Sequence, residues 1–199
     1  MRSTVGIVIP SYGDKAQWDK LAARAIDSVN VQTRMPNEVI RVHDDTLAKA
    51  RNKGIERCMS EYIICLDADD ELDPYYIEAM LRGYGDIRQP STLGVVNGVE
   101  DDAPVLIPRK PLFEGNYIVI GAMFKRMKAI EVGGFRELTA FEDWDLWVRM
   151  TMNGALVTSC PEAVYRVNVR QNSRNQTDDT LFHRLKAEYL AMPGVENIR

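Results

Sequence analysis

The stretch Tyr62-Ile63-Ile64-Cys65-Leu66-Asp67-Ala68-Asp69-Asp70 decides the fold class, because an unbroken apolar run passes directly into acid. Strands that are apolar at every position are typical of a parallel sheet buried on both faces. Upstream of this run, strand-like runs alternate with helical spacing. These elements are expected at residues 5–9 (strand), 14–33 (helix), 38–42 (strand) and 46–59 (helix). The alternation predicts an α/β fold with a mostly parallel central sheet flanked by helices.

The rest of the chain is less regular. Asp73 as N-cap and Pro74 at the first helical position predict a helix after the acidic turn. Glycine, proline and acidic clusters loosen the pattern between residues 82 and 115. The remaining elements expected are strands at 93–96, 105–107, 117–124, 156–159 and 164–167, and helices at 141–153 and 177–191. No repeat or linker divides the 199 residues, and this length favours one domain.

The composition of the chain limits the classes of protein it can belong to and the compartment in which we expect it. The net charge is −4, whereas nucleic-acid binding typically needs a basic chain. Arg166, Arg170 and Arg174 fit either a local basic patch or a solvated face. Three cysteines without a C-x-x-C pair favour a reducing compartment. Pro10 comes too early for a signal-peptide core, and the longest apolar run, 117–124, is far below the ~20 residues of a membrane helix. We therefore expect a soluble, cytoplasmic protein without a membrane partner.

Acidic residues follow two of the three early strands. Asp44 and Asp45 come at the end of the second strand, and Asp67, Asp69 and Asp70 follow the third. Ligands of open α/β sheets bind beyond the carboxyl ends of the strands. Carboxylates crowded there repel one another unless a cation lies among them, and Mg²⁺ and Mn²⁺ prefer carboxylate and phosphate oxygens. The residues therefore predict a metal-assisted phosphate site.

Three simpler explanations compete for this acidic turn. Helix capping accounts for Asp73 but not for Asp67 or Asp69, which lie too far upstream. A calcium-binding loop fits the spacing of the acids, but Leu72 stands where its turn glycine belongs and Pro74 falls inside the loop. A plain solvated acidic turn stays open on these residues alone.

Short motifs follow one another in a fixed order along the chain. They are Ile7-Val8-Ile9-Pro10-Ser11-Tyr12, Ser28-Val29 with Gln32, Glu38-Val39-Ile40, Asp44-Asp45, Ala50-Arg51-Asn52-Lys53-Gly54-Ile55, Cys65-Leu66-Asp67-Ala68-Asp69-Asp70, Gly133-Gly134-Phe135, Glu142-Asp143-Trp144 with Leu146, and Tyr165-Arg166. Each is weak alone, but the ordered set, over roughly residues 5–175, resembles the family-two inverting glycosyltransferases of the GT-A fold. The resemblance implies one Rossmann-like, nucleotide-diphospho-sugar transferase domain over residues 1–199. Its nucleotide-binding half would span about 1–80, its acceptor and catalytic half about 81–175, and a C-terminal helix and tail 176–199.

The resemblance also implies roles for individual residues. Asp143 is expected to be the catalytic base that deprotonates the acceptor, Asp69 a direct metal ligand, and Asp67 a ligand of the ribose or the metal. The donor site is expected to comprise Pro10, Tyr12, Asp44, Asp45, Arg51, Asp67, Ala68 and Asp69. Arg51 would face the nucleotide, because its planar fork suits phosphate. The implied cofactor is Mn²⁺ or Mg²⁺, and the implied donor is a nucleotide-sugar, with a UDP-sugar favoured by family habit.

Three departures from the family pattern limit the prediction. The chain passes from Asp45 almost directly to the Ala-Arg-Asn motif, so either Asp44 or Asp45 can be the nucleoside contact. Asn168 stands where relatives often carry a metal-binding histidine, which leaves Asn168, His183 or water as the third ligand. His43, beside the acidic pair, is another candidate, although a structural histidine is the simpler interpretation. The Gln-x-x-Arg-Trp motif of processive synthases is absent, which favours transfer of a single sugar.

The sequence thus predicts a metal-dependent, inverting glycosyltransferase of the hexosyltransferase type. Its acceptor is left open among protein, glycan, nucleobase and small molecule. One alternative is a sugar-nucleotide pyrophosphorylase, although residues 10–15 contain one glycine rather than a glycine-rich, basic phosphate loop. The other is a non-catalytic module that binds a sugar nucleotide or a metal, against which Asp143 argues.

Overall fold

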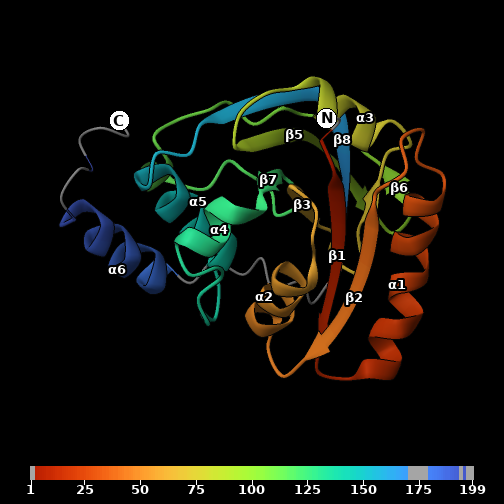
Figure 1. Ribbon diagram of the computed structural model, residues 1–199, viewed down its shortest axis with the longest axis horizontal. Coiled ribbons are helices and arrows are strands. Elements are labelled where there is room, and N and C mark those ends of the chain that lie inside the picture. Colours follow the sequence, from red (N-terminus) through yellow and green to blue (C-terminus); the bar gives the residue numbers. More distant parts are fainter. Residues whose placement is uncertain (1–2, 170–178, 193–194, 196–199) are drawn as a thin grey trace.

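The computed structural model describes residues 3–169, 179–192 and 195 as an α/β structure around one curled sheet (Figure 1). The strands are β1 (Val5–Tyr12), β2 (Glu38–Asp44), β3 (Tyr62–Cys65), β4 (Glu71–Leu72), β5 (Ile87–Val96), β6 (Val99–Glu100), β7 (Met123–Lys125) and β8 (Val157–Val169). The helices are α1 (Lys15–Asn30), α2 (Leu47–Arg57), α3 (Tyr76–Arg82), the 3₁₀ helix η1 (Leu112–Glu114), α4 (Arg126–Glu131), α5 (Glu142–Met152) and α6 (Asp179–Leu190). The predicted fold class is confirmed.

The sheet runs in the order β2-β1-β3-β7-β5-β8-β4, with β6 paired to β5. β1 is parallel to both β2 and β3, and β5 is parallel to β8. The other pairings, which involve β7, β4 and β6, are antiparallel. Parallel pairing is thus complete in the N-terminal half, where the sequence alternates strand and helix, and the sheet as a whole is mixed.

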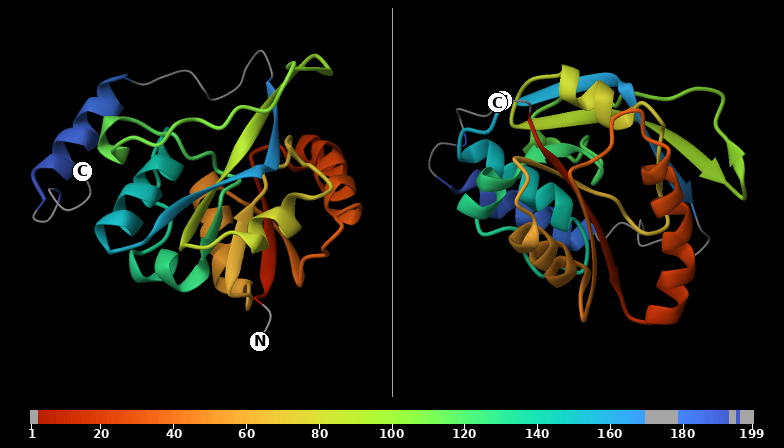
Figure 2. Two further views of the ribbon diagram at one scale, coloured as in Figure 1. Left: turned by 90° about the horizontal axis from the view of Figure 1, so that it is seen from above. Right: turned by 45° about the vertical axis from the view of Figure 1, so that its right-hand side comes forward.

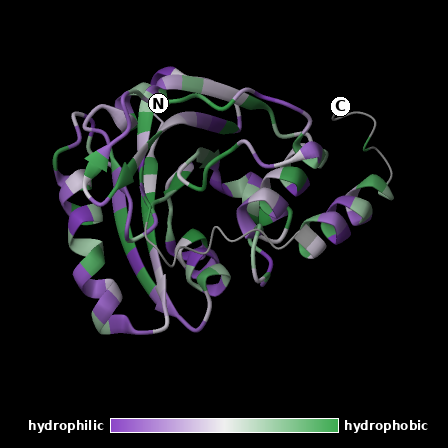
Figure 3. Cartoon of the chain, turned by 180° about the vertical axis from the view of Figure 1, so that it is seen from behind, coloured by the Kyte–Doolittle hydropathy of each residue, from purple (hydrophilic) through white to green (hydrophobic). Residues whose placement is uncertain are grey.

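Helices cover the sheet on both sides. α1 and α2 pack against β1 from opposite sides, and α6 lies at the end of the molecule remote from α1 (Figures 1 and 2). β1 and β3 are mostly hydrophobic, whereas α1 carries both kinds of residue (Figure 3). Gly54 permits the close contact of α2 with β1, because a Cβ there would lie 2.2 Å from Val8 Cγ1. Among the described residues, no helix is long and apolar enough to cross a membrane.

The strand predicted at residues 117–124 is wrong over most of its length, since only β7 at its end pairs with the sheet. The segment before β7 is a buried loop whose carbonyl groups are satisfied by side chains. Gln89 Nε2 donates to Tyr117 O (2.9 Å), Trp147 Nε1 to Ile118 O (3.2 Å) and Tyr76 OH to Gly121 O (2.7 Å). These three donors take the place of a neighbouring strand, and no local sequence signal announces them.

Two predictions underestimated the C-terminal half of the sheet. β5 and β8 are continuous long strands, whereas short pieces were expected, because prolines argue against strand interiors. Pro90 is accommodated by a register shift between β5 and β8 at that point.

The helices also differ from the prediction. The six-residue helix α4 was not predicted, and α3 begins at Tyr76 rather than Pro74. Asp73 still accepts a hydrogen bond from Tyr75 N (3.2 Å) ahead of that helix. Arg170, Arg174 and the start of the predicted last helix lie outside the described residues.

Candidate active site

The parallel strands bring the first group of predicted site residues to one edge of the sheet. In the β1–β2 register Tyr12 lies opposite Asp44, so both occupy the carboxyl ends of their strands. β3 ends beside them, and Asp67 follows it after Leu66, whose N–H donates to Val8 O (2.9 Å). We call Tyr12, Asp44 and the turn Asp67–Asp70 the donor edge.

At the Tyr12 end of the donor edge, an aromatic pair lies beside the carboxylate of Asp44. The centroids of the Tyr12 and Trp18 rings are 5.9 Å apart. Asp44 accepts hydrogen bonds from Asp45 N (2.8 Å) and Lys53 Nζ (3.2 Å), and these hold the pKa of Asp44 below its ordinary value. The Asp45 side chain is 89% exposed, and its Oδ2 lies 3.9 Å from Lys49 Nζ. Pro10 is buried in β1, two residues before Tyr12, and its expected place in the donor site stays a prediction.

The acidic turn after β3 gathers three carboxylates. Asp70 N donates to Asp67 O (3.0 Å), which closes the turn, and Ala68 is buried inside it. Tyr165, from β8, accepts a hydrogen bond from Asp67 N (3.2 Å). Asp70 is only 7% exposed, and burial together with the charges of Asp67 and Asp69 raises the pKa of Asp70 well above its ordinary value. The turn therefore carries an excess of negative charge that favours a cation.

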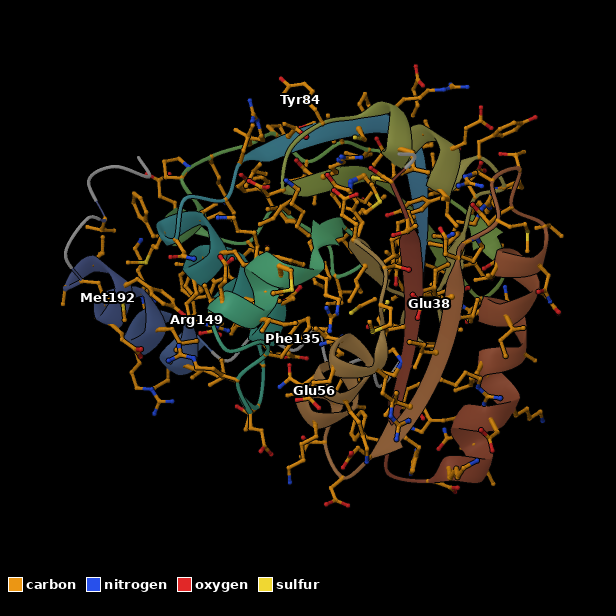
Figure 4. All side chains as sticks on the ribbon, in the orientation of Figure 1. Glu38, Glu56, Tyr84, Phe135, Arg149 and Met192 are labelled. Atoms are coloured by element: carbon orange, nitrogen blue, oxygen red, sulfur yellow. The ribbon has the colours of Figure 1, made fainter. Side chains whose placement is uncertain are left out.

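Arg51 connects the donor edge to the second half of the site. It is 2% exposed, with Nη2 2.8 Å from Asp67 Oδ1 and Nη1 2.9 Å from Glu142 Oε1. Its guanidinium lies over the Phe135 ring, 5.2 Å from the centroid, and Figure 4 shows Phe135 beside α2. The Arg51 fork thus already binds two carboxylates, and its expected phosphate contact stays a prediction.

Asn52 joins two of the motifs that carry the resemblance, the Ala-Arg-Asn motif of α2 and the Gly-Gly-Phe motif before α5. Its Nδ2 donates to Phe135 O (2.8 Å), and its Oδ1 accepts from Phe135 N (2.8 Å). Gly134 is required at this contact, because a Cβ there would lie 2.4 Å from Asn52 Oδ1, at a backbone φ of +69°. The Ala-Arg-Asn motif is thereby docked on the Gly-Gly-Phe motif, which leads into α5.

Asp143 lies in the first turn of α5, whose entry is set by Phe141 at a left-handed φ of 61°. Its Oδ1 accepts a hydrogen bond from Trp144 N (2.7 Å), and its Oδ2 accepts one from Asn116 Nδ2 (3.1 Å). Burial, followed by the neighbouring charge of Glu142, raises the pKa of Asp143 to about 6, against the opposing effect of Arg51. A carboxylate with this pKa is ionised at neutral pH and is a better proton acceptor than an ordinary aspartate.

The third metal ligand is not evident from the side chains that the structure places. Among the described residues, no three His, Cys, Asp or Glu side chains converge as a metal site. Asn168 N donates to Asp70 Oδ1 (2.8 Å) and its Nδ2 to Glu71 Oε1 (3.2 Å), so this residue adjoins the acidic turn. His43 Nδ1 pairs with Ser11 Oγ (3.0 Å), as a structural histidine would, and His183 is exposed on α6 with its ring near that of Phe182. Asn168 is the best placed of the candidates.

Comparison with known proteins agrees with this geometry. The profile of Glycosyl transferase family 2 matches residues 43–135. The putative glycosyltransferase EpsH of Bacillus subtilis is 37% identical over 70 residues, which is 34% of this chain and 20% of that relative. The amylovoran biosynthesis glycosyltransferase AmsE of Erwinia amylovora is 25% identical over 142 residues, or 65% of this chain and 53% of that relative. The chain therefore spans about half or less of the curated relatives it matches.

Solved structures show the same fold. The crystal structure of S. aureus TarS 1–349 in complex with UDP-GlcNAc superposes with a TM-score of 0.71 at 13% identity, covering 96% of this chain and 67% of that one. The UDP complex of TarS gives a TM-score of 0.68 at 15% identity, with coverages of 96% and 66%. At such identities the likeness establishes the fold alone. The chain thus has the GT-A fold, and the family profile, the named relatives and the ordered motifs together support its similarity to the glycosyltransferases of family 2.

Proposed function

We propose that the chain transfers one sugar from a nucleoside-diphosphate sugar to an acceptor hydroxyl, with inversion at the anomeric carbon. The observation that carries the proposal is the position of Asp143, a carboxylate with a pKa of about 6 that is joined to the donor edge through Glu142, Arg51 and Asp67. A proton acceptor next to a nucleotide edge is the arrangement that single-displacement transfer needs.

A uridine nucleotide is the proposed donor. The TarS structures contain UDP-GlcNAc and UDP, and they share the fold of this chain. Tyr12 and Asp44 lie side by side at the donor edge, and Trp18 is next to Tyr12, so an aromatic surface and a carboxylate are available to a base and a ribose. The donor sugar and the acceptor are not specified by these contacts. A cytoplasmic location also stays a prediction.

The acidic turn fits a divalent cation, Mn²⁺ or Mg²⁺, held by Asp69 and Asp67. Burial is the main cause of the raised pKa of Asp70, and the charges of Asp67 and Asp69 add to it. A cation among these carboxylates would offset the part that comes from charge repulsion. Two carboxylates suffice when the diphosphate and water supply the other ligands. Such an ion would neutralise charge on the departing diphosphate.

In this reaction, different residues of the chain would bind the donor, hold the site in place and accept the proton. The aromatic pair and Asp44 bind the nucleoside, while Arg51 keeps Asp67 and Glu142 in fixed positions. Asp143 takes the proton of the acceptor hydroxyl as its oxygen bonds to the anomeric carbon. The bond from that carbon to the diphosphate breaks, and its electron pair leaves with the nucleoside diphosphate.

Incubation with a panel of UDP-sugars tests this proposal without knowledge of the acceptor, since water can replace it. We expect slow, Mn²⁺-dependent UDP release from at least one donor, with the inverted anomer as the first product in NMR spectra. The Asp143→Asn variant should lose this activity, and the Asp102→Asn variant, altered at an exposed loop position, should keep it.

Other outcomes of this assay would support the alternatives. Formation of pyrophosphate from UTP and a sugar 1-phosphate would indicate a pyrophosphorylase. UDP binding without any turnover, in water or with a panel of sugar and peptide acceptors, would indicate a binding module. The presence of Asp143, with its pKa raised to about 6, favours sugar transfer over the pyrophosphorylase and over the binding module.

A further inference from the structure

Asn116, in the loop between η1 and β7, contacts the proposed catalytic base from outside its helix. Its Nδ2 lies 3.1 Å from Asp143 Oδ2, across 27 residues of sequence. The other carboxylate oxygen, Oδ1, accepts the N–H of Trp144 at 2.7 Å. Donors from two different elements therefore fix the Asp143 carboxylate, one from the helix backbone and one from the loop.

The orientation of the Asn116 amide is itself determined. Its Oδ1 accepts the N–H of Ile118 at 3.1 Å. A flipped amide would lose this bond and place its oxygen against the Asp143 carboxylate, where two acceptors repel. The NH₂ group must therefore face Asp143.

The loop that carries Asn116 is fastened to the same helix on both sides of that residue. Trp144 Nε1 donates to Leu112 O (2.5 Å) and Trp147 Nε1 to Ile118 O (3.2 Å). Behind the loop, the buried Gln89 donates from Nε2 to Tyr117 O (2.9 Å). The indoles of Trp144 and Trp147, which follow Asp143 on α5, thus hold the loop in register with the base. The Asn116–Asp143 distance is therefore a property of the fold.

We propose that Asn116 is a positioning residue for the base: it holds the Asp143 carboxylate so that a lone pair faces the acceptor hydroxyl. The proposal rests on the proposed function, because it assigns Asn116 a part in the same reaction. Asn116 is exposed and Asp143 is half-buried, so their contact lies near the surface, where an acceptor can approach. A hydrogen bond donated to the ionised carboxylate also favours that form over the protonated one.

The Asn116→Asp variant separates this role from a structural one. Aspartate keeps the acceptor for Ile118 N–H and hence the loop turn, but it replaces the donor at Asp143 with a second carboxylate. The matched control is Asn153→Asp at the other end of α5, where an exposed asparagine donates to Glu131 Oε2 (3.3 Å) and lies away from the base. Asn116→Ala serves as a second variant that adds no charge.

The experiment measures, against pH, hydrolysis of the UDP-sugar that the wild type turns over fastest in a donor panel. Separately, it measures the pKa of Asp143 by NMR titration of ¹³C-labelled aspartate, assigned with Asp143→Asn. We expect kcat to fall about tenfold or more in both Asn116 variants, with KM for the donor nearly unchanged. The Asp143 pKa should rise in both, by about one unit in Asn116→Asp. Asn153→Asp should match the wild type.

A wild-type kcat and an unshifted Asp143 pKa in folded Asn116→Asp would overturn the assignment. A fall in kcat that equals the fall in Asn153→Asp would overturn it as well. If the wild type itself turns over no UDP-sugar, the proposed function fails, yet the NMR titration still decides whether Asn116 controls the Asp143 carboxylate. The two failures are therefore distinguishable.

Discussion

The donor edge and the surroundings of Asp143 are built in different ways. At the donor edge, parallel strands place Tyr12, Asp44 and Asp67 through backbone hydrogen bonds. Around Asp143, the loop that contains Asn116 is attached to α5 and β5 by side chains that bond to backbone carbonyls. Arg51 is the one described residue with ion pairs to both regions. A side-chain substitution at the donor edge should therefore change the chemistry of the substituted group and leave the backbone in place. Near Asp143, a substitution can also move the loop, because side chains hold it.

The largest expected effect follows from neutralising the base. Asp143→Asn should lower sugar transfer about 10²–10⁴-fold, the contribution typical of a positioned base. It should not lower the melting temperature, because burial disfavours the ionised Asp143 in the folded state. UDP release and thermal melting check both parts.

Asp145→Asn is the matched control on the same helix. Asp145 is 0% exposed and pairs with Arg136 and with Arg149 (2.5 Å to Nη2), so its neutralisation should lower stability. Figure 4 shows Arg149 near α6. Arg136, the other partner of Asp145, donates a hydrogen bond to the hydroxyl of Tyr189 on α6 and so ties that helix to α5. Equal loss of stability in the two variants would contradict the assigned difference between the neighbouring acids.

The next largest effect should follow from removing the bridge between the two regions. Arg51→Met leaves Glu142 and Asp67 without their partner, and breaking a buried pair in this way costs about 3 kcal/mol of unfolding free energy. Arg24→Met, at an exposed pair with Glu71, should cost less than about 1 kcal/mol. Denaturant unfolding measures both, and similar values would show that the bridge does not join the two regions.

The pH dependence of kcat should follow the ionisation of Asp143 rather than that of the carboxylates at the donor edge. Since Asp143 must be ionised and its pKa is about 6, kcat should fall tenfold for each pH unit well below 6. The same raised pKa means that the contribution of Asp143 to stability falls as pH rises from about 4 towards 6. A pH–rate profile without an acid limb near 6 would argue against Asp143 as the base.

The smallest effect distinguishes the two candidate nucleoside contacts. Asp44 lies beside Tyr12, whereas Asp45 is 89% exposed. UDP affinity should therefore fall about tenfold in Asp44→Asn, as for loss of one hydrogen bond to a charged group. Asp45→Asn should change it less than about twofold. Calorimetry with both variants would reverse the assignment if Asp45→Asn were the weaker binder.

The two regions also differ in how far sequence could predict them. β1, β2 and β3 were predicted to within a few residues, because each coincides with a local β-rich run and the last two end in acid. Asp143 was found through motif resemblance, which also named Asn52 and Gly134 without explaining them. The loop before β7 was mistaken for a strand, because apolar composition does not reveal that Gln89, Trp147 and Tyr76 supply its hydrogen bonds.

Asn116 was missed for the same physical reason. Its contact with Asp143 spans 27 residues, and it exists only once both tryptophans of α5 have docked on the loop. The mutual contact of Arg51 and Glu142 spans 91 residues and likewise has no local signal. Long-range contacts made by side chains, whether with the backbone or with other side chains, are thus what the sequence left undetermined.

Parallel measurement of UDP binding and sugar transfer in three proteins tests the central claim most directly. The wild type should bind UDP in the presence of Mn²⁺ and turn over a UDP-sugar. Asp69→Asn should lose Mn²⁺-dependent binding, whereas Asp143→Asn should bind UDP as the wild type does and fail only in transfer. Loss of binding in Asp143→Asn, or full transfer by either variant, would contradict the account of a metal-bound donor edge and a separately held base.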